Sequence, residues 1–324
     1  MKALCMLGCV LGLLSVAQAE PPFALRRTIP LPDVQGCIDH FALDAAGERL
    51  FVAALGNHTV EVIDLRAGKV TRSLAGFQEP QGVAYVAEVK RLYVADGGDG
   101  EVHVFGGESL EPVTKIAFGD DADNLRYDAA AKRLYVGYGS GGLGVIAPAT
   151  NQKTGDIALT GHPESFQLEA GGSRIFVNLP GSHAIVVADR ARATVTGTWK
   201  LGFVAANFPM ALDEARQRLF VGCRMPARLL VFDTESGRQV AKFDLHGDCD
   251  DLFYDGLRSR LYVSCGEGFI DGFSQKDADH YIADESVKTV KGARTCFFDG
   301  ERLFLAVPRD GGRPAEIREY RVTR

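Results

Sequence analysis

The sequence of 324 residues lacks the short motifs by which many enzymes are recognised. It contains no Cys-x-x-Cys or His-x-x-x-His pair to fix a particular metal, and no Gly-x-Ser-x-Gly turn to carry a nucleophilic serine. After residue 19 it also has no run of ~20 apolar residues, the length that a membrane-spanning helix needs. These absences assign no reaction, and we expect no membrane span in the mature chain.

The first 19 residues differ in character from the rest of the chain. Lys2 gives a positive start, residues 3–16 are apolar, and residues 17–19 form a small-x-small cleavage site. The pattern predicts a signal peptide over residues 1–19 and one mature domain over residues 20–324. We therefore expect an exported protein, periplasmic or secreted.

Positive charge is in the minority in this sequence. Lys and Arg number 36 against 42 Asp and Glu, a formal net charge of −6 at pH 7. Such a surface repels phosphate backbones, which disfavours nucleic acid as a partner. Five cysteines follow residue 19, and an odd number in an oxidising compartment leaves at least one thiol unpaired.

A stretch of one arginine, two apolar residues and one aliphatic residue occurs seven times. The copies are Arg49-Leu50-Phe51-Val52, Arg91-Leu92-Tyr93-Val94, Arg133-Leu134-Tyr135-Val136, Arg174-Ile175-Phe176-Val177, Arg218-Leu219-Phe220-Val221, Arg260-Leu261-Tyr262-Val263 and Arg302-Leu303-Phe304-Leu305. By their residue numbers, successive arginines are 41 to 44 residues apart. A period near 42 with several strands per unit is typical of a β-propeller, because a four-stranded sheet gains a core only between identical neighbours.

The terminal repeats predict how the ring closes. In the first repeat we expect strands at residues 41–44, 49–53, 60–65 and 70–74, whereas the last repeat has strands at 302–307 and 316–322 and then ends. Residues 25–31 precede the first inner strand just as residues 69–74 precede the second. We therefore predict an all-β, seven-bladed propeller closed by an N-terminal outer strand. Because closure removes the open sheet edge, we expect a monomer.

The repeat resembles a known family. The Arg-Leu-Tyr/Phe-Val strand is followed by a Val-x-Val-Ile/Phe-Asp strand, as in residues 60–64, and this combination is similar to the YVTN-repeat family of seven-bladed propellers. The resemblance covers about residues 25–322. It implies the propeller fold, and it leaves the function open, because the wider group includes exported proteins, surface-layer proteins and lactonase-like enzymes.

Polar residues recur at one place in the repeat. In a propeller the loops entering each inner strand lie on one face, around the central channel. The position ten residues before each arginine, or eight in the last repeat, holds Asp39, Gln81, Asp123, Glu164, Phe208, Asp250 and Arg294. The following position holds His40, Gly82, Asn124, Ser165, Pro209, Asp251 and Thr295. The position after that is apolar in every repeat, so we expect the polar ring to begin abruptly at the channel mouth.

Converging carboxylates repel one another unless a cation or a proton intervenes. Oxygen ligands suit Ca²⁺ or Mg²⁺, and His40 extends the choice of divalent cation to Mn²⁺, Fe²⁺ or Zn²⁺, so the metal stays unassigned. Histidine titrates near neutral pH, and neighbouring carboxylates tune it. The candidate catalytic residues are therefore His40, Asp39 and Glu164.

Arginines of the later repeats predict a basic side to the mouth. Arg224, Arg228, Arg294 and Arg309 come from repeats five to seven, and arginine grips carboxylate or phosphate in a bidentate manner. An equally supported interpretation pairs Arg224 and Arg228 with Asp233 or Glu235 at the surface. The candidate ligand-binding residues are Gln81, Asp123, Asn124, Asp250, Asp251, Arg294, Thr295 and Arg224.

Three functional hypotheses follow from these residues. The first is an exported propeller that binds a small polar or anionic ligand at the channel mouth, with a divalent cation as one way to relieve the repulsion. The second is a metal-assisted, lactonase-like hydrolase or lyase. The third is a protein-interaction scaffold, which the charged ring argues against, since a flat presenting surface does not need one.

The cysteines of repeat six suggest a cross-strand bond. Folding the chain about residues 255–259 places Cys249 or Asp250 opposite Cys265, within the ~5.5 Å Cα separation typical of a disulfide. We therefore predict a Cys249–Cys265 bridge, with five free thiols as the alternative.

Overall fold

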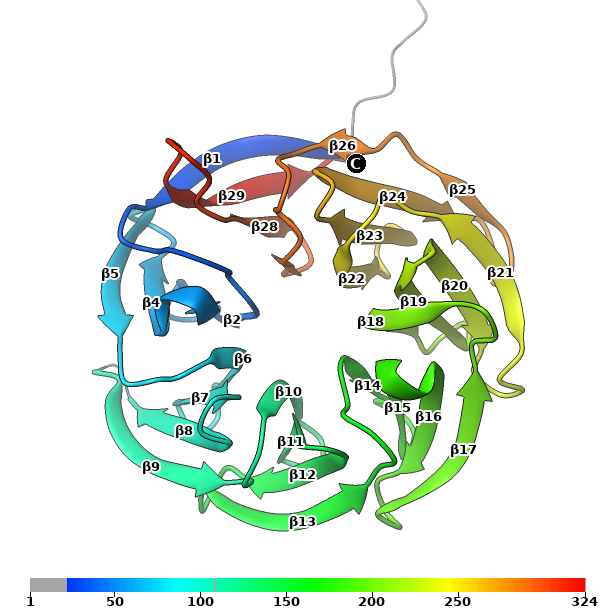
Figure 1. Cartoon of the computed structure of the whole chain (residues 1–324), viewed down its shortest axis with the longest axis horizontal. Coiled ribbons are helices and arrows are strands. Elements are labelled where there is room, and N and C mark those ends of the chain that lie inside the picture. Colours follow the sequence, from blue (N-terminus) through cyan, green and yellow to red (C-terminus); the bar gives the residue numbers. More distant parts are fainter. Residues whose placement is uncertain (1–21, 108, 324) are drawn as a thin grey trace, which may run out of the picture.

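The protein is a ring of seven antiparallel sheets around a central channel (Figure 1). A computed structural model describes residues 22–107 and 109–323. The predicted all-β, seven-bladed propeller is confirmed. Within these residues, no helix is long and apolar enough to cross a membrane. The predicted signal peptide lies outside the described residues.

The first four blades each use four consecutive strands, named here from the channel outwards. Blade one contains β2 (Phe41–Asp44), β3 (Arg49–Ala54), β4 (Thr59–Asp64) and β5 (Lys69–Leu74), with the 3-10 turn η1 (Leu55–Asn57) after β3. Blade two contains β6 (Pro80–Val86), β7 (Arg91–Asp96), β8 (Glu101–Gly106) and β9 (Glu111–Ala117). Blade three contains β10 (Ala122–Asp128), β11 (Arg133–Tyr138), β12 (Gly142–Ala147) and β13 (Gln152–Ala158). Blade four contains β14 (Phe166–Leu168), β15 (Arg174–Leu179), β16 (Ala184–Asp189) and β17 (Thr194–Lys200), with η2 (Pro180–Ser182) after β15.

The last three blades complete the ring. Blade five contains β18 (Ala205–Asp213), β19 (Arg218–Met225), β20 (Ala227–Asp233) and β21 (Gln239–Asp244). Blade six contains β22 (Cys249–Asp255), β23 (Arg260–Cys265), β24 (Phe269–Gln275) and β25 (Tyr281–Ala283), and the short β26 (Val287–Lys288) also pairs with β24. Blade seven contains β27 (Cys296–Phe298), β28 (Arg302–Val307), β29 (Ala315–Val322) and, outermost, β1 (Phe23–Leu31).

The arginine-led strand is the buried centre of each blade. In β3 every residue from Leu50 to Ala54 is 0 % exposed. Arg49 starts the strand and pairs with Asp44 on β2 at 2.6 Å. Arg174 with Glu169, at 2.6 Å, and Arg302 with Asp299, at 2.8 Å, repeat this pairing. In these three blades the repeat thus combines a buried strand with an ion pair that holds the turn before it, whereas Arg218 pairs instead with Asp233 and Asp279.

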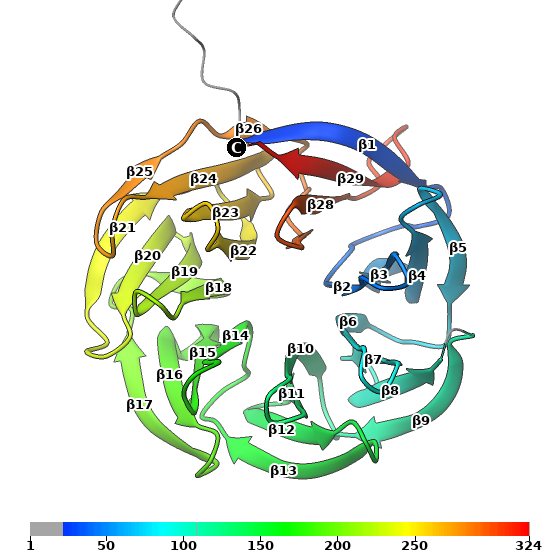
Figure 2. The same ribbon diagram turned by 180° about the vertical axis from the view of Figure 1, so that it is seen from behind.

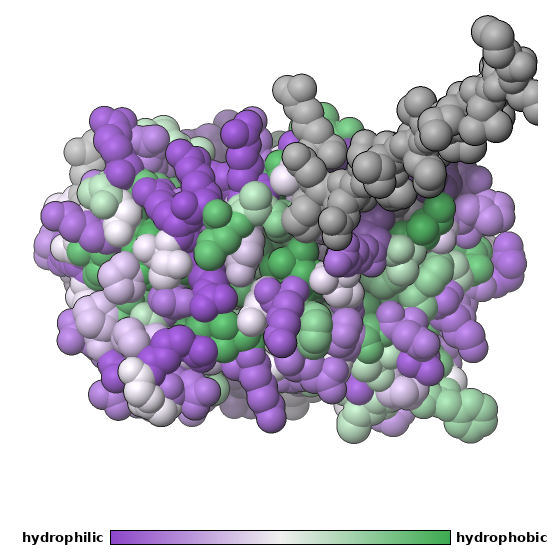
Figure 3. Space-filling model, turned by 90° about the horizontal axis from the view of Figure 1, so that it is seen from above, coloured by the Kyte–Doolittle hydropathy of each residue, from purple (hydrophilic) through white to green (hydrophobic). Residues whose placement is uncertain are grey.

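Each blade buries both of its faces against its neighbours. On β7, Leu92 packs in a cluster with Phe51 of blade one, whereas the next residue, Tyr93, packs in a cluster with Leu125 of blade three. Side chains of a strand alternate between faces, so consecutive apolar residues serve two different interfaces. The outer strands are polar, as in the mostly exposed β9, and the edge of the disc is a mixture of hydrophilic and single apolar side chains (Figure 3).

The N-terminal strand closes the last blade, as predicted. Strand β1 runs antiparallel to β29, with Ile29 opposite Ile317, and lies outside β29 in both views of the ring (Figures 1 and 2). The fully buried Glu319 accepts hydrogen bonds from Arg27 at 2.5 Å and from Arg26 at 3.2 Å. Apolar packing and a buried ion pair therefore both hold the ring shut.

Closure predicts unequal effects for two apolar residues of β1. Ile29 is 0 % exposed and Leu25 is 53 % exposed. Ile29→Ala should lower the free energy of unfolding by about 2–4 kcal/mol, because it leaves a cavity at the closing interface. Leu25→Ala, the matched control, should change it by less than about 0.5 kcal/mol. Denaturant melts of both variants test this, and equal losses would mean that β1 does not close the ring.

The cysteine prediction is right in register and wrong in bonding. Cys249 and Cys265 lie opposite each other on β22 and β23, but both are free thiols. The sulfur of Cys249 packs against Gly222 of blade five, where an added Cβ would lie 3.1 Å away. The sulfur of Cys265 instead faces Asp271 of β24, at 3.6 Å. The two thiols therefore point toward different neighbours, which strand register alone does not reveal.

Thiol reactivity follows from this arrangement. Cys37 is exposed, whereas Cys223, Cys249, Cys265 and Cys296 are buried. Burial raises the pKa of Cys249 to about 12, which removes the reactive thiolate. In protein that begins at residue 20, one thiol should react with an aromatic disulfide reagent under native conditions and five after denaturation. Fewer than five reactive thiols in denaturant would indicate that a disulfide is present.

Candidate functional site

A cavity of about 860 Å³ opens at the channel where the inner strands converge. It is lined by all but one of the predicted site residues: Asp39, His40, Gln81, Asp123, Asn124, Glu164, Arg224, Asp250, Asp251 and Arg294. Thr295 is the exception. It is 2 % exposed, and its single hydroxyl hydrogen has two acceptors within reach, the carbonyl of Ile38 at 3.0 Å and Asp250 at 3.3 Å. Thr295 thus supports the lining from behind.

An irregularity of the inner strands explains why neighbouring residues both reach the cavity. In blade one the N–H of Asp39 donates to the carbonyl of Ala53 at 2.7 Å, and the N–H of Ala53 donates to the carbonyl of His40 at 3.0 Å. Two residues therefore oppose one, as in a β-bulge. Register breaks occur at the equivalent places, between Pro80 and Val83, Ala122 and Leu125, Asn207 and Met210, and Cys249 and Asp251. The bulge re-aims two consecutive side chains at the channel.

The pair Asp39 and His40 lines this cavity. Their side chains are 21 % and 23 % exposed and lie 3.7 Å apart. Burial raises the pKa of Asp39 to about 6, against the opposing effect of His40. Burial lowers the pKa of His40, but the negative charges of Asp39, Asp251 and Asp123 raise it by more than burial lowers it, and the pKa is about 9. At neutral pH His40 is therefore mainly a cation, suited to donate a proton rather than to accept one.

Asp251 completes this group from blade six. Its carboxylate accepts a hydrogen bond from the N–H of Cys296 at 2.7 Å. Burial nevertheless raises its pKa to about 7, because that single bond and the attraction of His40 do not replace the lost hydration. Asp251 thus titrates near neutrality.

The prediction of a basic side to the mouth is wrong, because its arginines are neutralised by aspartates. Arg224 hydrogen-bonds to Asp250, and its Nε lies 3.3 Å from Asp248. Arg294 lies 3.1 Å from Asp248 and 3.1 Å from Asp250. Two arginines and two aspartates therefore neutralise one another. Asp248, which the ring pattern did not predict, belongs to this ion-pair network.

The two remaining loop arginines lie outside the cavity lining. Arg228 pairs with Asp244, at 2.6 Å, rather than with Asp233 or Glu235. Arg309 donates to the carbonyl oxygens of Val34, at 3.2 Å, and Pro32. Arg228 thus pairs across β20 and β21, and Arg309 anchors the loop after β1, so neither is a free cation at the mouth.

The structure adds Arg126 to the lining, a residue that the ring pattern missed. It lies on β10, between Leu125 and Tyr127, which pack into the blade interface. Its Nη1 donates to the carbonyl of Leu125 at 2.9 Å, and its guanidinium lies 5.8 Å from the centre of the Phe166 ring. Burial lowers the pKa of Arg126. Among the described residues, no carboxylate forms an ion pair with it.

His162 and Glu164 meet Asp123 between blades three and four. Donor atoms of these three residues all lie within 4.8 Å of one another. The interaction with Asp123 raises the pKa of His162 to about 9, and burial raises the pKa of Glu164 to about 7. The pattern located Asp123 and Glu164, whereas His162 comes from the loop before β14 and was outside the predicted set.

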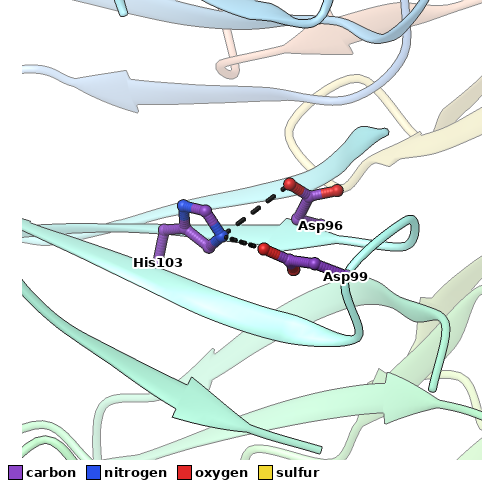
Figure 4. Close-up of side chains that lie close together, drawn as sticks. All are labelled: Asp96, Asp99 and His103. Atoms are coloured by element: carbon purple, nitrogen blue, oxygen red, sulfur yellow. Dashed lines mark hydrogen bonds and ion pairs between the residues drawn. The ribbon is translucent and has the colours of Figure 1, made fainter. Parts of the chain in front are cut away.

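A second group of potential ligands, Asp96, Asp99 and His103, lies in blade two (Figure 4). The side-chain atoms that would bind a metal ion already form hydrogen bonds and ion pairs within the protein. Asp96 accepts backbone N–H bonds from Gln78 at 2.8 Å and Glu79 at 2.6 Å, and Asp99 accepts from His103 at 2.8 Å. Lys115 places an ammonium 3.1 Å from Asp99. This group therefore stabilises a hairpin and lies outside the cavity lining.

Comparison with known proteins identifies the fold alone. No family model and no curated protein matches the chain. A chain in the "Crystal Structure of Mitotic Checkpoint Complex" is similar with a TM-score of 0.79 and 14 % identity, covering 100 % of this chain and 99 % of that one. A chain of Kuenenia stuttgartiensis hydrazine synthase is similar with a TM-score of 0.71 and 17 % identity, covering 92 % and 96 %. At such low identity the likeness supports a propeller and no particular activity.

The raised pKa values of Asp39, Asp251 and His40 predict that stability falls as pH rises. The folded state holds the Asp251 proton up to pH 7 and the His40 proton up to pH 9, whereas the unfolded chain releases them near their ordinary values, 3.8 and 6.5. Raising the pH from 5 to 9 therefore costs the folded state more than the unfolded state.

Asp251→Asn tests this sign. In EDTA the stability advantage of the variant over the wild type should be larger at pH 8 than at pH 5 by on the order of 2 kcal/mol, because the folded wild type loses the Asp251 proton between these values whereas the unfolded chain has released it at both. Asp244→Asn, at a position 84 % exposed, is the control and should leave the pH profile unchanged. Thermal melts across this pH range suffice, and a wild type that becomes more stable toward pH 9 would contradict the cause given.

Proposed function

We propose that the protein binds a small carboxylate-bearing ligand in the central cavity, with Arg126 as the anchor for the carboxylate. The observation that carries the proposal is the guanidinium of Arg126, which faces the cavity without an ion pair among the described residues. Arg224 and Arg294, by contrast, are neutralised by aspartates. Burying an arginine without a counter-ion is costly, so an anion arriving in the cavity gains a charge-assisted, bidentate contact.

The surroundings of Arg126 suit a compact organic acid. The same cavity is lined by Ala42, Ala211 and Phe297, which offer apolar contact. The amide nitrogen of Gln167 donates to the carbonyl of Met210 at 2.7 Å. Cavities with apolar walls and a few placed polar groups are typical of small-molecule sites. His40, with its raised pKa, supplies a second cationic contact near the mouth.

The enzymatic alternative uses the same cavity. His40 as a proton donor, with Asp39 or Glu164 as the base, supports hydrolysis or elimination of a bound acid or lactone. Turnover of lactones that His40→Gln abolishes would establish it. The scaffold alternative rests on fold likeness to a chain of the mitotic checkpoint complex and on no feature of this cavity.

Membership of the YVTN-repeat group and export to the periplasm or outside the cell are part of the same proposal. They rest on the repeat and on the leader pattern of residues 1–19. N-terminal sequencing of protein recovered outside the cytoplasm should begin at residue 20.

Calorimetric titration tests the carboxylate site. Succinate, malate and citrate, titrated in EDTA, should include at least one that binds the wild type, and Arg126→Gln should weaken that binding at least about 10-fold through loss of the bidentate contact. Arg228→Gln removes an arginine outside the cavity and is the matched control. Binding that survives Arg126→Gln, or a wild type that binds none of these acids, would refute the assignment.

A further inference from the structure

Three side chains at the seam of blades three and four offer metal-binding atoms to one point. Asp123 comes from the bulge of β10, and His162 and Glu164 come from the loop that enters β14. Their donor atoms lie within 4.8 Å of one another, on the wall of the cavity. One imidazole nitrogen with two carboxylates is a donor set of zinc and manganese sites, whereas Ca²⁺ and Mg²⁺ prefer oxygen donors alone.

The orientation of His162 is the second observation that favours a metal ion. Its Nδ1 lies 2.7 Å from the carbonyl oxygen of Gly139. A carbonyl can only accept, so Nδ1 carries a proton, and in the neutral ring the lone pair lies on Nε2. Nε2 faces Asp123, at 3.9 Å. Metal-binding histidines are held in this way, with the far nitrogen donating to a backbone carbonyl.

The loop that carries His162 and Glu164 is fixed in place. Pro163 packs over Gly137, where an added Cβ would meet its ring at 3.1 Å. The N–H of Glu164 donates to the carbonyl of the buried Asn178 at 3.0 Å. A preorganised loop of this kind reduces the entropy lost when its side chains bind an ion.

Asn124 supplies a third observation, independent of the acidic residues. It is 1 % exposed, and its Oδ1 has no hydrogen-bond partner within the described part of the chain. Its Nδ2 donates to Asp123 at 3.3 Å, so the amide adjoins the cluster, and it borders the cavity. A buried amide oxygen without a partner costs about 1–3 kcal/mol, a cost that a cation or its bound water would relieve.

We propose that Asp123, His162 and Glu164 bind one Zn²⁺ or Mn²⁺ ion at the wall of the cavity. The inference does not rest on carboxylate binding at Arg126. It is specific to this cluster, because the ligand atoms of Asp96, Asp99 and His103 already interact with one another (Figure 4), with backbone N–H groups and with Lys115.

Metal titration of protein stripped with EDTA and then freed of chelator is the direct test. Zn²⁺, Mn²⁺ and Ca²⁺ are each followed by calorimetry, with Co²⁺ absorption as a probe of nitrogen coordination. The wild type should bind one Zn²⁺ or Mn²⁺ per chain and bind Ca²⁺ at least about 10-fold more weakly. Glu164→Gln and His162→Gln should each weaken Zn²⁺ binding at least about 100-fold while keeping the wild-type circular dichroism.

Two control variants locate the ion. His183→Asn replaces an exposed histidine of the same blade at a positive φ of 47°, which asparagine tolerates, and should bind metal as the wild type does. His103→Gln alters the blade-two group and should also leave binding unchanged. Loss in His103→Gln with retention in Glu164→Gln would place the metal in blade two and overturn the proposal, as would a wild type that binds none of these ions below millimolar concentration.

Arg126→Gln separates this proposal from the carboxylate site. The variant should bind the metal at least as tightly as the wild type, because it removes a positive charge near Asp123, while losing carboxylate binding in EDTA. Carboxylate binding without metal binding would refute the metal site alone, and the reverse result would refute the carboxylate site alone. If Glu164→Gln fails to fold, the more conservative Glu164→Asp provides the same reading, since its shorter side chain withdraws the ligand.

Discussion

Burial of both faces of every blade between its neighbours is the constraint on which this structure depends. A four-stranded sheet with a buried strand such as β3 would expose apolar residues on two sides if it stood alone. The ring solves this only when it closes, and closure requires β1 to occupy the outer place in blade seven. The same closure brings seven inner strands to one axis, so whatever side chains stand at their ends share a single space.

The β-bulges determine what that space contains. A regular strand would send alternate residues into the blade interfaces, whereas the bulge directs pairs such as Asp39 and His40 to the channel. The cavity thereby gathers six acidic and five basic side chains, counting its histidines. Charges so nearly balanced can be buried together, although unevenly. Arg224 and Arg294 are fully paired, and Asp251 retains a raised pKa. Arg126 forms no ion pair among the described residues, although the charges of Asp251 and Asp123 act on it from a distance.

The repeat was sufficient to predict the blades, their order, the closing strand and most of the lining, because each follows from periodicity. It could not reveal which side chains pair once they converge. Asp248 and His162 each lie twelve residues before the arginine of their repeat (260 − 248 and 174 − 162), two positions before the predicted ring, so the ring pattern did not include them. Asp248 neutralises Arg224 and Arg294, which the basic-side hypothesis required to be free. Arg126 was missed for a different reason. It lies three residues after Asp123, at a repeat position that faces the channel again after the apolar position. In blades one and five this position holds Ala42 and Ala211. Thiol direction at Cys249 depends on packing against Gly222, which register does not encode.

Asp123 connects the two proposed sites electrostatically. It is a ligand candidate beside His162, and its negative charge also acts on Arg126, whose pKa it supports against burial. A cation held by Asp123 would offset that charge and leave the guanidinium with a stronger positive potential toward the cavity. The metal would then increase affinity for an anion without touching it, and by linkage the anion would increase metal affinity by the same factor. A single aspartate at a β-bulge thus relates the charge of one site to the occupancy of the other.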